Sequence, residues 1–260
     1  KEDGIYKIDL NSGNVNLIIS IADIVNNKPL PEFFHNNNWL EHLMYNPAGN
    51  RFMFFHRWNY NGKDYTRLYT ANSKNGSDLH MFPDTKFYSH ADWKNNNEIT
   101  IWTKPQKIIN ETNKIKTKTS LIKFLKIPMK AIYKLLKPFM GQETIRKFSN
   151  QSKLVTFKDK TFNYSIIEKY ILTGNGHITW SKDKSKILLD TYEDKCNFRH
   201  LMVFNINNKQ IIPLGKFYSK YNSCIYRADL HPRYNYSEDY IIIDSAHYNK
   251  RKILIIKPRL

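Results

Sequence analysis

The sequence predicts an all-β fold, a β-propeller of TolB/WD40-like blades, because one phrase occurs in it four times. In each copy a histidine is followed three positions later by an aromatic residue, then by a polar turn and an apolar strand. The clearest copy, GHITWSKDKSKILLDTY, covers residues 176–192, and the copies begin their phrases at His42, His90, His177 and His231. Self-similarity at roughly forty to fifty residues, with short strands between turns, is typical of propellers with four-stranded blades.

The composition agrees with a single large β-rich core. The 260 residues are 41% hydrophobic and 14% aromatic, with 17 Tyr and 15 Phe, which exceeds what a helical bundle needs. Gly is scarce at 9 residues, so Asn, Lys and Asp are expected to form the turns. Cys196 and Cys224 have neither a CxxC spacing nor a disulfide framework. No stretch reaches the roughly eighteen apolar residues of a membrane span.

The expected strands follow one another in blade order. Residues 3–19 form an alternating hairpin that predicts the outer half of a blade, and a loop leads from it to the first full repeat. The later repeats are expected at residues 39–83, at 88–104 resuming at 154–167, at 176–219 and at 227–260. About four and a half blades are visible, and closed propellers usually have four to eight. We therefore expect residues 1–260 to be one propeller domain, N-terminally incomplete, from a ring of six or seven blades.

Residues 105–151 interrupt a blade and differ from it in composition. Apolar residues stand at helical spacing among lysines, and Pro128 and Pro138 break the pattern. The pattern predicts a basic α-helical insertion of one or two amphipathic helices. Two interpretations remain open: an arm that binds a membrane surface or a polyanion, or a segment that packs its apolar face on the side of the propeller.

The formal charge of +18, from 41 basic and 23 acidic side chains, favours a polyanionic partner. Acidic polysaccharide, anionic lipid and nucleic acid all fit the charge, and a Lys- and Asn-rich composition accounts for part of it. Nucleic acid is not expected, because the sequence contains no RNP-like, zinc-finger or helix-turn-helix phrase.

The repeats predict where polar side chains gather. In a propeller blade the first strand begins, and the second strand ends, at the same rim. We expect rim positions for the four repeat histidines and for the ends of the second strands, namely His56, Arg57, Tyr192, Ser245 and His247. A histidine at a blade junction also has a structural interpretation, a hydrogen bond to the backbone of the neighbouring repeat.

Clustered imidazoles are suited to metal ligation and to proton transfer near neutral pH. The segment from Arg227 to Arg233 adds Asp229 and two guanidinium groups to the same rim. Together with Tyr192 and other arginines of the strands, these groups predict a site that binds a carboxylate and moves a proton. The additional arginines are Arg57, Arg67 and Arg199.

Four phrases resemble the propeller-type polysaccharide lyases, that is, the oligogalacturonate lyases, the ulvan lyases and uncharacterised bacterial relatives. They are the phrase of residues 176–192, LGKFYS at 214–219, RADLHPR at 227–233 and DSAH at 244–247. The resemblance covers most of the chain outside residues 105–151, and its motifs are more specific from Gly176 onward.

The resemblance implies β-elimination on an acidic, uronate-containing polysaccharide, with a divalent metal such as Mn, Zn or Ca. In the oligogalacturonate lyase pattern an arginine precedes a histidine at the head of the next blade, and in the ulvan lyase pattern histidines and a tyrosine serve as base and acid. The catalytic candidates are then His42, His56, Arg67, His90, Tyr192 and Arg199. The implied substrate-binding residues are Arg57, Arg227 and Arg233, and the implied metal ligands are His177, Asp229, His231 and His247.

Two positions depart from the pattern. Ala228 stands where relatives often have cysteine, and Pro232-Arg233 replace a second histidine after His231. The alternative interpretation is therefore a non-catalytic propeller scaffold for bacterial surface-glycan assembly, with the basic helices docked on a membrane or a partner. A lyase would act in the periplasm or outside the cell, whereas the scaffold would be cytoplasmic or membrane-peripheral.

Overall fold

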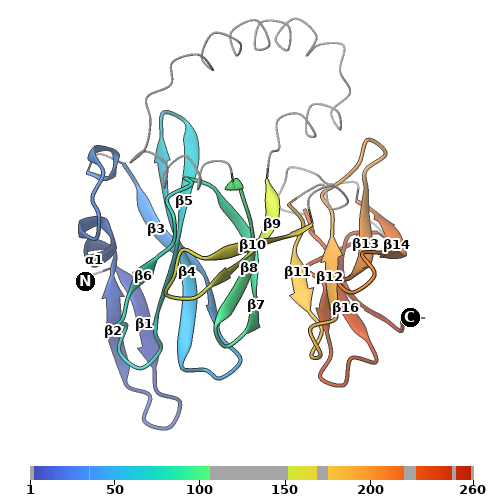
Figure 1. Ribbon diagram of the computed structural model, residues 1–260, viewed down its shortest axis with the longest axis horizontal. Coiled ribbons are helices and arrows are strands. Elements are labelled where there is room, and N and C mark those ends of the chain that lie inside the picture. The colour runs from blue at the N-terminus through green and yellow to red at the C-terminus, as the bar shows by residue number, and fades with distance from the viewer. Residues whose placement is uncertain are drawn as a thin grey trace, which may run out of the picture. The chain divides into compact units, whose positions relative to one another are not determined.

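The computed structural model describes residues 3–34, 36–105, 152–168, 175–219, 227–247 and 250–258. In this part of the chain the regular structure is almost entirely β (Figure 1), with one short α-helix, α1 (Ile21–Asn26), and one 3₁₀ turn at Pro31–Phe33. Within the same residues, no helix has the length and apolarity to cross a membrane. The predicted helical insertion falls on residues that the structure does not describe.

The chain divides into two compact units, which we describe separately. Unit 1 comprises residues 1–108 and 154–166, and unit 2 comprises residues 109–153 and 167–260. Unit 1 begins with an antiparallel hairpin of β1 (Gly4–Ile8) and β2 (Val15–Ser20). This hairpin matches the outer half-blade predicted from the sequence.

Two four-stranded antiparallel sheets complete unit 1. The first has β3 (Asn38–Tyr45), β4 (Arg51–Tyr60), β5 (Lys63–Asn72) and β6 (His80–Met81) in order. The second has β7 (Tyr88–Asn95), β8 (Glu98–Thr103), β9 (Lys153–Lys158) and β10 (Tyr164–Glu168) in order. Because β8 and β9 are neighbours in this sheet, residues 104–152 connect its second and third strands. The blade thus resumes after the insertion, as the sequence predicts.

Both faces of β4 are buried, and they pack on different partners. Phe52 and Phe54 join a cluster with Ile5, Ile19 and Ile24 of the N-terminal segment. Met53 and Phe55, which alternate with Phe52 and Phe54 along β4, belong to a second cluster. This cluster also contains Leu68, Ala91 and Trp93. Successive side chains of a strand point to opposite faces, so the first sheet of unit 1 lies between the hairpin and the second sheet.

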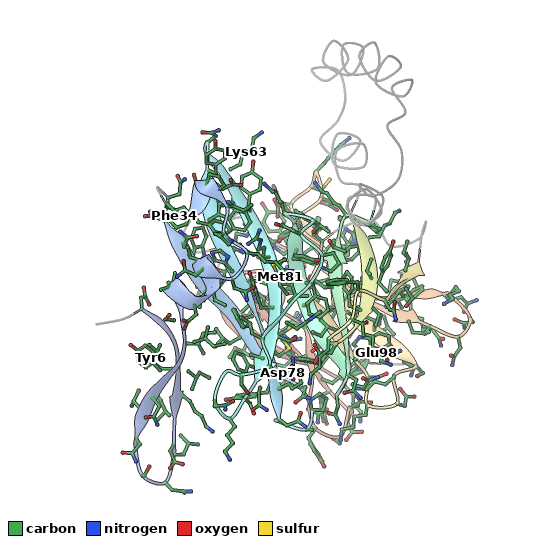
Figure 2. The ribbon with its side chains drawn as sticks, turned by 60° about the vertical axis from the view of Figure 1, so that its left-hand side comes forward. Tyr6, Phe34, Lys63, Asp78, Met81 and Glu98 are labelled. Carbon is green, nitrogen blue, oxygen red and sulfur yellow. The ribbon has the colours of Figure 1, made fainter. Side chains whose placement is uncertain are left out.

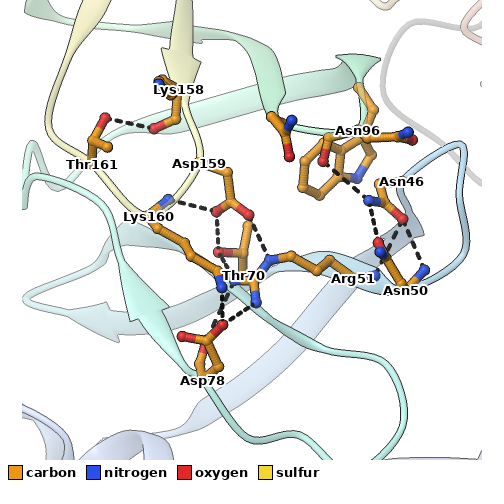
Figure 3. A network of polar contacts seen from close by, with 12 residues as sticks. Asn46, Asn50, Arg51, Thr70, Asp78, Asn96, Lys158, Asp159, Lys160 and Thr161 are labelled. Atoms are coloured by element: carbon orange, nitrogen blue, oxygen red, sulfur yellow. Dashed lines mark hydrogen bonds and ion pairs between the residues drawn. The ribbon is translucent and has the colours of Figure 1, made fainter.

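A buried polar network holds the strand pair β9–β10 on the first sheet (Figure 3). The side chain of Arg51 donates from Nε to Asp159 at 2.5 Å, from Nη1 to Asp78 at 2.9 Å and from Nη2 to Thr70 at 2.9 Å. Asp159 also accepts from the Thr70 hydroxyl at 2.7 Å. Figure 2 places Asp78 at the end of the sheet opposite Lys63, so the network lies at that end.

Unit 2 contains a four-stranded and a three-stranded antiparallel sheet. The first consists of β11 (Ile178–Trp180), β12 (Lys186–Asp190), β13 (Phe198–Asn205) and β14 (Ile211–Tyr218) in order. The second consists of β15 (Arg233–Tyr234), β16 (Ile241–Ser245) and β17 (Lys252–Ile256) in order. Leu188, Leu201 and Val203 of the first sheet pack against Ile241 and Ile243 of the second.

The five sheets confirm the predicted all-β blade architecture. Among the described residues there are three four-stranded sheets, one three-stranded sheet and one hairpin, which agrees with about four and a half blades. A ring of six or seven blades, and a single domain over residues 1–260, stay predictions.

Candidate functional site

In unit 2 the two repeat histidines lie next to each other. His177 directly precedes β11 and His231 lies two residues before β15, so each stands at the head of its blade's first strand. Their ring centroids are 4.2 Å apart, and the ring planes meet at 65°. The predicted approach of these two repeat positions is therefore present within unit 2.

One buried carboxylate holds both histidines. Asp190, at the end of β12, is 2% exposed. It accepts from the backbone N–H of His177 at 2.6 Å, from the backbone N–H of His231 at 3.2 Å and lies 3.1 Å from Nδ1 of His177. Gly176 permits this approach, because a Cβ there would lie 1.7 Å from the carbonyl oxygen of Asp190. The glycine and the aspartate of the repeat phrase thus position His177.

A second carboxylate supports His231 in the same way. Asp244 of β16 has Oδ2 3.0 Å from Nδ1 of His231, and the sequence offset of 13 residues equals that between His177 and Asp190. A carboxylate at Nδ1 favours the tautomer that carries its proton there, so the lone pair of each neutral ring lies on Nε2. Histidines oriented by a carboxylate through one ring nitrogen are the usual metal ligands of proteins.

Asp229 completes a group that is suited to a metal ion. One ligand atom each from His177, Asp229 and His231 lie within 4.8 Å of one another, and within the described residues this is the one such group of three. Two imidazole nitrogens and one carboxylate oxygen are donors for Zn²⁺ or Mn²⁺, and three protein ligands leave positions for a ligand. The donor set and its supporting carboxylates therefore fit a divalent metal.

Two arginines form ion pairs with Asp229. Arg199 is 1% exposed and lies with Nη1 2.8 Å from Oδ1 of Asp229 and with Nη2 3.1 Å from Glu193. Arg227 donates from Nη2 to Oδ2 of Asp229 at 2.9 Å. Arg199 is thus a buried structural cation that positions Asp229, whereas Arg227 is partly exposed. These ion pairs also compete with a metal for the carboxylate.

Tyr192 lies beside Arg227. The guanidinium carbon of Arg227 is 5.3 Å from the centre of the Tyr192 ring. Burial, and then the nearby charge of Asp229, raise the pKa of Tyr192 above its usual value. The hydroxyl is therefore protonated at neutral pH, as that of an ordinary tyrosine is.

The remaining two predicted site residues of unit 2 have other contacts. Nδ1 of His247 accepts the backbone N–H of Tyr218 at 3.0 Å, so His247 is not a member of the metal-type group. Arg233 donates from Nη1 to the carbonyl oxygen of Ile178 at 3.0 Å and also contacts the Thr179 hydroxyl. These contacts give His247 and Arg233 positions in the sheet junctions, and the ligand and substrate roles predicted for them are not supported.

In unit 1 the repeat histidines also approach each other, on bulged strands. His42 and His90 lie within β3 and β7, where the register shifts between Glu41 and Met44 and between Ser89 and Ala91. Their backbones have positive φ values of 56° and 29°. The ring centroids are 6.4 Å apart, and the His42 ring stacks on Phe55 at 5.0 Å.

His56 and Arg57 point to opposite faces of β4, which corrects the expectation that both reach one rim. Nε2 of the fully buried His56 is 2.9 Å from Asn38 Oδ1, and its ring stacks on Trp58. Burial, and then the charge of Arg67, lower the pKa of His56 to about 4. A neutral, enclosed imidazole is a core residue, so these contacts do not support a catalytic role.

Arg67 lies on the same face as His56 and is equally enclosed. Its Nε and Nη2 donate to Asp84 at 2.9 and 2.6 Å, and its Nη1 donates to the carbonyl oxygen of Lys28 at 2.9 Å. The guanidinium also packs over Phe33 and Trp58. The structure thus gives Arg67 a structural ion pair, and the catalytic role predicted for it has no support from this environment.

Comparisons with known proteins identify the fold. No protein-family model matches the sequence, and no curated protein matches it. Among solved structures, an oligogalacturonate lyase from Vibrio parahaemolyticus matches with a TM-score of 0.55 and 15% identity, over 96% of this chain and 53% of that one. An oligogalacturonate lyase in complex with manganese matches with a TM-score of 0.52 and 9% identity, over 99% and 72%.

The fold is a β-propeller. A solved structure from a study of two prolyl endopeptidases matches the chain as well, with a TM-score of 0.52 and 10% identity over 99% of this chain and 31% of that one. Propellers of different activities are thus similar to the chain, and at these identities the likeness shows the fold alone. The chain spans about half the length of the lyase from Vibrio parahaemolyticus.

Three carboxylates that orient histidines of the propeller are not among the site residues predicted from the sequence. They are Asp190 and Asp244 in unit 2 and Glu41 in unit 1, whose Oε1 lies 3.0 Å from Nδ1 of His42. A signal for the first two was present, because both follow a repeat histidine at an offset of 13 residues. Glu41 had no such signal, because it precedes its histidine within a bulge.

Proposed function

We propose that this propeller binds acidic, uronate-containing glycans and cleaves them by β-elimination, as a polysaccharide lyase does. The observation that carries the proposal is the group of His177, Asp229 and His231 with Arg227 and Tyr192 beside it. Such a group combines a positively charged arginine, which can bind the carboxylate of a uronate, with a tyrosine that can donate a proton.

The first requirement of β-elimination on a uronate is neutralisation of the carboxylate, which makes the neighbouring C5–H more acidic. Arg227 is suited to this role, because its side chain is partly exposed and Asp229 fixes its orientation through Nε and Nη2 at 3.1 and 2.9 Å. His177, Asp229 and His231 would hold a divalent metal. When bound, such an ion supplies further positive charge for the carboxylate.

The second requirement is proton transfer in two places. A base takes the C5 proton, the C4–O bond breaks with its electron pair leaving on oxygen, and an acid protonates that oxygen. We assign the acid to Tyr192, because a tyrosine hydroxyl carries its proton at neutral pH and its ring lies 5.3 Å from the guanidinium carbon of Arg227. An imidazole with its lone pair on Nε2 is suited to be the base, and His231 is the more exposed of the two in unit 2.

An imidazole that binds a metal cannot also take a proton, so the ligand and base roles of His231 exclude each other. Chelation separates them. Full-length protein is incubated with polygalacturonate and ulvan, and the unsaturated product is followed by its ultraviolet absorbance. Loss of activity with a chelator and recovery with Mn²⁺ or Zn²⁺ would assign His231 as a ligand, whereas unchanged activity would assign it as the base.

Variants test the remaining assignments. Arg227→Gln is expected to lower kcat/KM by roughly tenfold to a hundredfold, the effect of losing a charge-assisted hydrogen bond. Tyr192→Phe should lower kcat with little change in KM. Arg251→Gln makes the same charge change at an exposed position and should leave both constants unchanged. Absence of product on every uronate substrate would remove the enzymatic part of the proposal.

A second candidate is a non-catalytic propeller that binds acidic glycan as a scaffold. It is favoured by the ion pairs of Asp229, since Arg199 and Arg227 both lie within 2.9 Å of its oxygens. A carboxylate so engaged is a weaker metal ligand. Saturable binding of oligogalacturonate without product, and independent of metal, would favour the scaffold. A membrane or partner contact through residues 105–151 would be tested by deleting them and following localisation.

A further inference from the structure

The turn between β12 and β13 of unit 2, residues 191–197, carries two side chains of the candidate site. Tyr192 lies beside Arg227, and Glu193 has Oε2 3.1 Å from Nη2 of the buried Arg199. Both residues of the turn lie outside the strands, so the sheet ladder does not fix them. Their positions depend on the contacts that hold the turn.

Asp194 closes this turn on itself. Its Oδ1 accepts from the backbone N–H of Cys196 at 2.8 Å and from that of Phe198 at 2.9 Å. Its own N–H donates to the carbonyl oxygen of Phe198 at 2.9 Å, and its carbonyl oxygen accepts from the N–H of Asn197 at 3.1 Å. Asn197 has a φ of 62°, in the left-handed region that asparagine tolerates better than most residues. These bonds leave Oδ2 of Asp194 for a partner outside the turn.

His200 of β13 is that partner, and it also holds the other end of the turn. Its Nε2 lies 2.9 Å from Oδ2 of Asp194, and Nε2 is the donor because a carboxylate only accepts. The N–H of His200 donates to the hydroxyl oxygen of Thr191 at 3.0 Å, and its carbonyl oxygen accepts from the N–H of Thr191 at 3.0 Å. One histidine thus contacts the residues directly before and after the pair Tyr192–Glu193.

Neighbouring residues of β13 therefore hold neighbouring acidic residues of the turn. Arg199 is buried and contacts Glu193. His200 points to the opposite face of the strand and contacts Asp194. The side chains of His200 and Asp194 are 41% and 35% exposed, and an ion pair this exposed contributes little to stability. The contacts of the pair instead fix the path of the backbone over residues 191–194.

We propose that His200 and Asp194 are positioning residues that hold Tyr192 at the candidate site of unit 2. Neither of the two is among the site residues predicted from the sequence. The role of Tyr192 as the acid rests on the proposed function, whereas the pair itself rests on the contacts of the turn. A hydroxyl that protonates a leaving oxygen is sensitive to its position, since a misplacement of about 1 Å can cost roughly a hundredfold in rate.

The first experiment measures the position of Tyr192 without substrate or metal. Fluorotyrosine is incorporated at the position of Tyr192 in the full chain and followed by ¹⁹F NMR. Arg227→Gln is the positive control, because that guanidinium lies over the ring. We expect His200→Leu, which cannot donate to Asp194, to shift or broaden the signal. His200→Gln should keep the signal near its wild-type position, because a glutamine amide can still donate. Asp194→Asn should move the signal, and Asp239→Asn, at an exposed position, should not.

The second experiment measures turnover of polygalacturonate by the same variants. His200→Leu should lower kcat by roughly tenfold or more, because the hydroxyl of Tyr192 is displaced. KM should change little, because Arg227 and its contact with Asp229 are retained. His200→Gln should have a kcat close to that of the wild type.

The positioning role is overturned if the ¹⁹F signal of His200→Leu stays at the wild-type position, even if its Tm falls, since such a contact only stabilises the fold. It is also overturned if His200→Gln disturbs the signal as much as His200→Leu does. A moved signal without product from any protein, the wild type included, leaves the pair standing and removes the catalytic proposal. A moved signal with unchanged kcat leaves the pair standing and removes Tyr192 as the acid. Normal turnover by His200→Leu with an unmoved signal removes the pair and leaves the catalytic proposal standing.

Discussion

The two units place histidines at the same position of the repeat, yet the surroundings give them different chemistry. In unit 2 the residue at an offset of 13 is an aspartate, which accepts from Nδ1 of His177 and of His231. In unit 1 the corresponding residue of the first blade is Phe55, on which the His42 ring stacks. The carboxylate that orients His42 is Glu41, the preceding residue of the same strand.

This difference shows how a repeated scaffold diversifies. The blade determines where the histidine stands, and the end of the second strand determines what supports it. A buried aspartate produces a pair of imidazoles suited to a metal, whereas an aromatic ring leaves an imidazole beside an arginine. One residue per blade therefore separates a histidine supported by a carboxylate from a histidine that stacks on an aromatic ring.

The largest effect is expected from Asp190→Asn. Asp190 is buried and accepts from two backbone N–H groups and one imidazole. Loss of hydrogen bonds to a buried carboxylate costs about 1–3 kcal/mol of unfolding free energy, and loss of the supporting carboxylate should lower metal affinity by roughly a hundredfold. Urea denaturation and metal titration measure the two effects. Asp239→Asn, at an exposed position, is the control, and equal stability of the two variants would contradict the central role of Asp190.

Metal addition should distinguish the two histidine pairs directly. At a free metal concentration of about a hundred times Kd, binding stabilises the folded state by about 2.7 kcal/mol. We expect Zn²⁺ or Mn²⁺ to raise the Tm of the wild type, of His42→Gln and of His90→Gln. His177→Gln and His231→Gln should abolish the rise. A metal effect that is lost in the unit 1 variants instead would reverse the comparison.

The pH dependence of stability is expected to show the difference between the buried His56 and the histidines of the rim. Burial lowers its pKa in the folded state from 6.5 to about 4, so between these values the unfolded chain binds a proton that the folded chain does not. Stability from His56 is therefore present above pH 6.5 and is lost as the pH falls toward 4. The expected loss is about 2 kcal/mol at pH 5.

Denaturation of the wild type and of His56→Phe at pH 7 and pH 5 measures this loss of unfolding free energy. The loss of stability between the two pH values should be smaller in the variant. An equal pH dependence of wild type and His56→Phe would show that His56 titrates normally in the folded state.

The smallest effect is expected from Asp244→Asn. Its carboxylate contacts Nδ1 of His231 from a position that is 42% exposed, so solvent already weakens the interaction. Metal affinity should fall by roughly tenfold, or about 1.4 kcal/mol, with little change in Tm without metal. A loss as large as that of Asp190→Asn would mean that the two aspartates share the role equally.

Much of the fold could be predicted from the sequence, because a blade is a local unit. The alternating strands and the polar turns of each repeat are set by neighbouring residues, and the strands found at 4–20, 38–81 and 178–218 follow the predicted order. The pairing of His177 with His231 followed from the repeat as well. The sequence also predicts these two histidines and Asp229 as metal ligands, and in the structure the three form the group that could hold a metal.

The repeat phrase accounts for the blade architecture and for a histidine at each first strand, although the predicted place at the strand's head holds in unit 2 and not in unit 1, where His42 and His90 lie within β3 and β7. Only the tertiary structure decided what each side chain faces. His56 and Arg57 are neighbours in sequence, but strand alternation sends one into a core and the other toward Glu41. The bulges at His42 and His90 and the reach of Asp190 to two blades depend on packing between sheets. Contacts between residues distant in sequence are not encoded in any local pattern, and for that reason the chemistry of each rim became visible only in three dimensions.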